Sequence, residues 1–180
     1  MSGLAPDEGI TQRVEAALAN LDDFTSRDRS TSFRSWAECK LDLALLFACY
    51  DGAERVAAAF KVPSDYDIFM SKVGGGLTDG YFDFSPPDVV LSNTKYDAEF
   101  YADPAFAISA DVSPVHGYWL PVGGTDHKYM NYLCCDSSLA CYGTIYRGDD
   151  DHPHYQDSPY RAHDSFVGLL EWIGKHGQDK

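Results

Sequence analysis

The stretch Leu120–Arg147, LPVGGTDHKYMNYLCCDSSLACYGTIYR, decides the fold of this chain. An almost continuous apolar run of strand length, Tyr129–Cys135, follows the Gly123-Gly124 pair. Asp136–Ser138 supplies turn residues, and a second β-branched and aromatic run begins at Gly143. We therefore predict two strands joined by a turn in the middle of a sheet. No residue in the stretch is placed like a nucleophile beside its base, so the stretch indicates a scaffold rather than a reaction.

Other short apolar runs precede this hairpin, and proline-containing turns separate them. They are Gly80–Phe84, Val89–Leu91, Phe106–Ala110 and Tyr118–Val122. Their length and their β-branched and aromatic content favour strands.

Helical periodicity dominates the first 76 residues. We expect a disordered tail over residues 1–10 and a first helix capped by Thr11. Ser35 and Glu38 have the spacing of a capping box, which predicts a helix to about Tyr50. The alanine-rich residues 53–60 and residues 64–73 form two further predicted helices, the second capped by Ser64 and ended by three glycines.

The helix from Trp36 to Tyr50 carries apolar residues on more than one face, including Leu41 and Leu45. We expect burial on most sides, with a dimer interface as the alternative, so the chain is predicted to be a monomer or a homodimer. A closing helix over residues 164–175 presents an apolar stripe, and all three tryptophans (Trp36, Trp119 and Trp172) are expected in the core.

This order of elements predicts an α+β fold: a mixed, mostly antiparallel sheet backed by helices, with extra N-terminal helices and a closing C-terminal helix. A chain of 180 residues fits one domain. We place that domain at residues 11–180, with a core at 53–176 and a helical extension at 11–52.

The composition narrows the function classes. A net charge of −14, spread along the whole chain, argues against binding nucleic acid, because phosphates are repelled. The N-terminus lacks a basic, apolar leader, and no window reaches the roughly 18 apolar residues of a membrane span, so we expect a cytoplasmic protein without membrane contact. Five cysteines without a C-x-x-C pair are typical of reduced, partly buried thiols rather than a zinc site. We expect no metal and no cofactor.

Four segments resemble the SUKH superfamily in their order and spacing. They are VPSDYDIFMSKVGGG (62–76), LPVGGTDHKYMNYLCCDSS (120–138), GTIYRGDDDHPH (143–154) and AHDSFVGLLEWIGKH (162–176). The resemblance covers roughly residues 53–176. It implies a mixed sheet backed by helices, and binding of another protein rather than catalysis.

Members of this superfamily include fungal cell-wall synthesis regulators and many bacterial immunity proteins. The resemblance therefore implies an immunity protein that neutralises a cognate toxin, often a nuclease. With the acidic composition, the expected partner is a basic toxin domain bound by an acidic face. The alternative in the same class is a regulatory scaffold that binds a cellular protein.

The loop after the second hairpin strand is the first candidate for partner binding. Asp149, Asp150, Asp151 and His152 can form an acidic finger that meets lysines or arginines of a partner. A solvated acidic loop is the plain alternative. A third interpretation is a small metal-dependent hydrolase, with Asp151, His152 and His154 as ligands and a contribution from Asp126 or His127.

The second candidate is the acidic and aromatic segment around Gly80. On a strand, Tyr81 and Asp83 share one face while Phe82 and Phe84 point to the core. Asp79 adds a further carboxylate to this segment. Asp126, in the turn before the central strand, is expected to border the same cleft, although turn formation alone also accounts for it.

Overall fold

The computed structural model describes residues 6–21, 25–26, 34–78, 82–102, 117–125, 129–148 and 161–176. These residues contain helices α1 (Pro6–Ala19), α2 (Trp36–Asp51), α3 (Ala53–Ala59), α4 (Ser64–Val73), α5 (Pro87–Ala102) and α6 (Phe166–His176). The strands are β1 (Thr25–Ser26), β2 (Leu77–Thr78), β3 (Phe82–Phe84), β4 (Trp119–Thr125), β5 (Tyr129–Cys134), β6 (Ile145–Gly148) and β7 (Arg161–His163).

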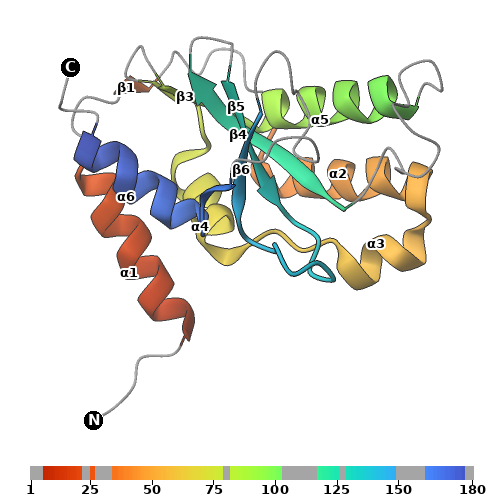
Figure 1. Ribbon diagram of the computed structural model, residues 1–180, viewed down its shortest axis with the longest axis horizontal. Coiled ribbons are helices and arrows are strands. Elements are labelled where there is room, and N and C mark those ends of the chain that lie inside the picture. Colours follow the sequence, from red (N-terminus) through yellow and green to blue (C-terminus); the bar gives the residue numbers. More distant parts are fainter. Residues whose placement is uncertain are drawn as a thin grey trace.

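The strands form one sheet in sequence order, β1 to β7, and each described neighbouring pair is antiparallel. Figure 1 shows α1 and α6 to the left of the central strands and α2, α3 and α5 to the right. This arrangement confirms the predicted α+β fold with N-terminal helices and a closing helix. The sheet was predicted to be mixed, but all of its described strand pairs are antiparallel.

The predicted hairpin is confirmed as β5 and β6, which pair from Met130↔Gly148 to Leu133↔Ile145. Because successive side chains of a strand point to opposite faces, β5 separates two clusters. Leu133 and Cys135 face the main core, whereas Tyr132 and Cys134 pack with Trp119 on the other face. The Gly123-Gly124 pair, predicted to precede a strand, lies inside β4 itself.

Aromatic rings from three elements meet in the main core. Tyr66 and Phe69 of α4 contact Phe166 of α6, at centroid distances of 4.7 and 4.9 Å, and Phe69 also meets Phe84 of β3 at 5.1 Å. Fully burying one such side chain contributes about 1.5–3 kcal/mol. These contacts join the closing helix to the N-terminal half of the domain.

A buried carboxylate connects the same two helices. Asp65 of α4 accepts hydrogen bonds from the N–H groups of Tyr66 and Val167, both at 2.9 Å. Val167 lies in the first turn of α6, where backbone N–H groups lack partners within the helix. Asp65 therefore caps α6, with Ser165 accepting from the Gly168 N–H at 3.1 Å.

The prediction of a strand at Val89–Leu91 is wrong, because this run belongs to α5. Pro87 occupies the first helical position and Asp88 the first turn, both of which favour a helix start. Val90, Thr94 and Ala98 are buried at a spacing of four residues, which is helical. The other predicted strand, Phe106–Ala110, lies outside the described residues.

Further predictions about helix starts and about side-chain burial are also wrong. Helix α1 begins at Pro6, so residues 6–10 are helical rather than part of a disordered tail, and Thr11 lies inside the helix rather than at its cap. Pro63 occupies the N-cap of α4, so Ser64 is a helix residue and not its cap. Leu41 and Leu45 are 67% and 66% exposed, which contradicts burial of α2 on most sides. Trp172 is 49% exposed on α6 rather than in the core.

Candidate functional site

One of the eight predicted partner-binding residues, Asp83, lies within the described part of the chain, in the middle of β3. Its neighbours Phe82 and Phe84 are buried in the core, as the alternation predicted. The others lie outside the described residues: Asp79, Tyr81, Asp126, Asp149, Asp150, Asp151 and His152.

The strand register brings together the strand ends that adjoin these acidic segments in the sequence. Asp83 pairs with Gly124, Gly124 with Met130, and Met130 with Gly148. This row crosses four strands, and we call it the acidic sheet end. Asp149 is the next residue after Gly148.

The neighbouring row gives the same result. Phe82 pairs with Thr125, and Thr125 pairs with Tyr129. Tyr81 directly precedes Phe82, and Asp126 directly follows Thr125. Three segments that are far apart in the sequence therefore leave the sheet at one end.

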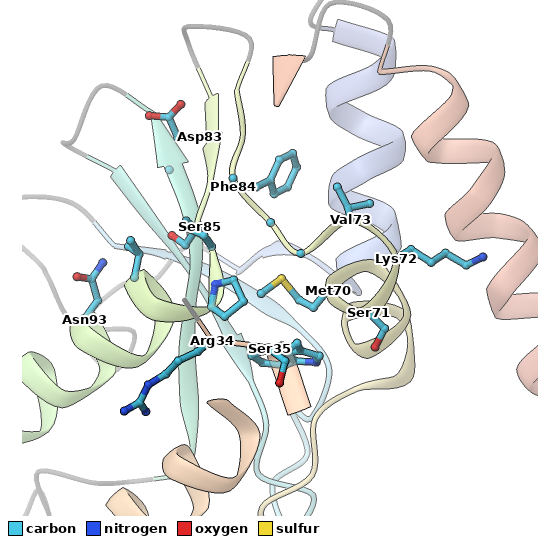
Figure 2. Close-up of a pocket in the computed structure, with 18 of the residues that line it drawn as sticks. Arg34, Ser35, Met70, Ser71, Lys72, Val73, Asp83, Phe84, Ser85 and Asn93 are labelled. Carbon is cyan, nitrogen blue, oxygen red and sulfur yellow. The ribbon is translucent and has the colours of Figure 1, made fainter. Parts of the chain in front are cut away.

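A pocket of about 780 Å³ opens beside the acidic sheet end. Its lining includes Asp83, Gly124, Tyr129 and Met130 from the sheet, together with the starts of α2 and α5 and the end of α4. In Figure 2, Met70 lies in the middle of the labelled side chains, between Asp83 and Arg34, and Lys72 points away from them. Asp83 contributes a carboxylate and Arg34 a guanidinium to the lining, and Met70 belongs to the buried main core.

The turn after α4 shapes one wall of this pocket. Gly74 adopts a left-handed conformation with φ of 74°, which ends the helix as the three glycines predicted. Gly75 also has a positive φ, of 66°, and a Cβ there would collide with the carbonyl oxygen of Ser85. The Gly76 N–H donates to the Phe84 carbonyl at 2.9 Å, which holds the turn against β3.

The cations of the pocket are held by carboxylates. Arg34 forms an ion pair with Asp42 of α2, and Lys72 pairs with Glu15 of α1 at 2.6 Å. Trp36 donates its indole N–H to Asp67 at 2.7 Å, which fixes the ring at the pocket wall. Asp42 and Glu15 thus partly offset the positive charge beside the pocket.

Tyr129 is a surface residue that sequence reasoning did not select. It is 38% exposed, and the guanidinium of Arg147 lies over its ring at 4.0 Å from the centroid. Tyr129 precedes the row of the acidic sheet end by one residue on β5. Exposed tyrosine and arginine side chains are enriched at protein interfaces.

A second group of charged residues lies away from the pocket. Arg55 is 3.7 Å from Asp51 and 3.8 Å from the fully buried Asp136, and so joins α2 and α3 to the turn after β5. Burial, followed by a hydrogen bond with Asp51, raises the pKa of Tyr118 to about 12. This group links elements of the fold, and we assign it a structural role.

The metal interpretation stays a prediction. Asp126, His127, Asp151, His152 and His154 all lie outside the described residues. Within the described ranges, no three His, Cys, Asp or Glu side chains converge as metal ligands.

Protein-family models, curated proteins and solved structures were compared with this chain, and none of them matches it. None of the helices in the described ranges has the length and apolar content to cross a membrane.

Proposed function

We propose that this chain is a non-catalytic cytoplasmic protein-binding domain, an immunity protein that neutralises a basic toxin domain through its acidic sheet end. The observation that carries the proposal is the strand register from Asp83 to Gly148. That register brings to one end of the sheet the strand residues that adjoin three acidic segments in the sequence, and clustered charges steer an oppositely charged partner.

The negative net charge of the chain supports a positively charged partner. At −14, the whole molecule repels nucleic acids and acidic proteins and attracts basic ones. Many toxin domains of the nuclease class have to bind phosphates, and a basic groove serves that purpose. An acidic surface that covers such a groove would exclude the substrate without any chemical step.

We expect the pocket beside the acidic sheet end to hold one lysine or arginine side chain of the partner. Lysine and arginine combine an aliphatic stem with a charged head. In this pocket, Met130 would contact the stem, and Asp83, in the same cross-strand row, would meet the head. A partner side chain bound in this way becomes largely desolvated, as the residues that dominate binding energy usually are.

The experiment is a pull-down from the native host at low salt, with the full chain as bait and mass spectrometry as the readout. We expect one near-stoichiometric basic protein. Its C-terminal domain should be toxic when expressed alone and harmless when expressed together with this chain. Several housekeeping proteins without toxicity would instead favour the regulatory scaffold.

A further inference from the structure

Two thiols face each other across the turn that joins β5 to β6. The Sγ atom of Cys141 lies 3.5 Å from the Sγ atom of Cys134. Cys134 ends β5 and is fully buried, whereas Cys141 is partly exposed. A disulfide has an S–S distance of about 2.05 Å, so the two sulfurs would have to approach by roughly 1.5 Å.

Backbone hydrogen bonds fix both cysteines relative to each other. The Cys134 N–H donates to the Thr144 carbonyl at 3.0 Å, and the Gly143 N–H donates to the Cys134 carbonyl at 2.9 Å. The Cys141 carbonyl accepts from the Thr144 N–H at 3.0 Å and from its hydroxyl at 2.6 Å. Because Thr144 is hydrogen-bonded to both cysteines and Gly143 to Cys134, the proximity of the thiols is built into the turn.

The surroundings separate this pair from the other cysteines. Cys134 and Cys141 belong to the small apolar cluster around Trp119. Cys39 and Cys135 face the main core on the other side of the sheet, and Cys49 is exposed on α2. All five cysteines lie in the described residues. Among them, Cys141 is the one whose thiol lies next to the thiol of Cys134.

We propose that Cys134 and Cys141 are a redox-active pair that closes to an intramolecular disulfide when it reacts with a low-molecular-weight disulfide such as oxidised glutathione. The Cys141 thiolate first attacks one glutathione sulfur, forms a mixed disulfide and releases one glutathione thiolate. The Cys134 sulfur then attacks Cys141, and the second glutathione leaves. Two protein thiols are oxidised, one glutathione disulfide is reduced, and the two protons pass to the glutathione thiolates.

The order of these steps follows from exposure. Cys141 is reachable from solvent, whereas Cys134 is enclosed. Burial also raises the pKa of the Cys134 thiol, which disfavours its reactive thiolate. Cys141 is therefore the first to react, and Cys134 is the resolving thiol.

The pair lies at the opposite end of β5 from the acidic sheet end. Cys134 pairs with Trp119, whereas Tyr129 pairs with Thr125. The proposed oxidation is therefore independent of the proposed partner-binding surface.

The test uses the folded full chain with Cys49→Ser, so that the exposed thiol cannot take up glutathione. After incubation with oxidised glutathione, the protein is unfolded, its remaining thiols are alkylated and its mass is measured. We expect alkylation of two of its four thiols, without bound glutathione. Fragmentation of the tryptic peptide 129–147 should place the bond between Cys134 and Cys141, and a reductant should restore all four thiols.

Two variants in the same background complete the test. Cys141→Ser should keep three alkylated thiols and form no bond. Cys135→Ala removes the neighbouring thiol on the opposite face and should still form the bond. Alkylation of all four thiols after oxidation, or a bond that includes Cys135, would overturn the proposal even if the Cys135→Ala variant fails to fold.

Discussion

At the residue scale, Asp97 of α5 makes stability depend on pH. Burial raises the pKa of its carboxyl group from 3.8 to about 7, partly opposed by a hydrogen bond with Tyr132. In the unfolded chain the carboxyl group ionises near pH 4, whereas in the folded chain it stays protonated up to about pH 7. The unfolded state therefore binds fewer protons in this window, and stability falls as pH rises from about 4 to about 7.

We expect the Asp97→Asn substitution to remove this loss of stability with rising pH. One pKa unit corresponds to about 1.36 kcal/mol, so the variant should gain up to about 4 kcal/mol over wild type at pH 8 and little at pH 4. Denaturant unfolding at both pH values measures the difference. His163, whose pKa is lowered by burial, changes stability with pH in the opposite sense. Because both proteins contain His163, its contribution cancels in the difference between their unfolding free energies. Equal stability of the two proteins at pH 8 would contradict the assignment.

Asp83 is the second prediction at this scale. Asp83→Asn keeps the shape of the side chain and removes its charge beside the pocket. We expect its affinity for the partner to fall about tenfold, equivalent to about 1.4 kcal/mol. Calorimetry measures the loss, and Glu54→Gln, which removes an exposed charge on α3, serves as the matched control. Equal affinities for the two variants would remove Asp83 from the interface.

At the element scale, α2 offers a matched pair of leucines. Leu43 is fully buried, whereas Leu45, two residues later, is 66% exposed. Leu43→Ala should cost about 2–5 kcal/mol of unfolding free energy, and Leu45→Ala less than about 1 kcal/mol. Denaturant unfolding measures both. A large loss for Leu45→Ala that grows with protein concentration would instead place this face of α2 in a homodimer.

The capping of α6 gives another prediction at this scale. Asp65→Ala would leave the Val167 N–H buried without its acceptor, and we expect a loss of about 2 kcal/mol. Ser35→Ala removes the exposed cap of α2 and should cost only about 1 kcal/mol. Denaturant midpoints compare the two variants, and a smaller loss for Asp65→Ala than for Ser35→Ala would refute this role of Asp65.

Elements with a long, regular pattern were predictable from the sequence. The stripe of α6 formed where predicted because its apolar residues recur with a clear helical period. The hairpin of β5 and β6 formed where predicted because two apolar runs of strand length flank a group of turn residues. Val89–Leu91 was misassigned because three apolar residues fit a strand and a helix equally well. Its helical state depends on Pro87 at the first position and on packing of α5 against α2 and β4.

At the scale of the whole molecule, the site was only partly predictable. Asp83 followed from alternation within one strand, which is local information. The pocket did not, because its walls come from residues 34–37, 70–76 and 83–87, together with Val89, Asn93, Gly124, Tyr129 and Met130. Their meeting depends on the register of β3, β4 and β5, and no short sequence pattern encodes that register.

The measurement that tests the central claim most directly is the salt dependence of partner affinity for two charge-reversal variants. One carries Asp79→Lys, Asp126→Lys and Asp150→Lys, in the segments that adjoin the acidic sheet end in the sequence. The other carries Glu8→Lys, Glu54→Lys and Glu99→Lys on helices, and the two have the same net charge. Screening weakens interactions between exposed charges, so wild type and the helix variant should bind at low salt and lose affinity as salt rises. The sheet-end variant should bind at least tenfold more weakly at low salt, whereas equal affinities of the two variants would contradict the account.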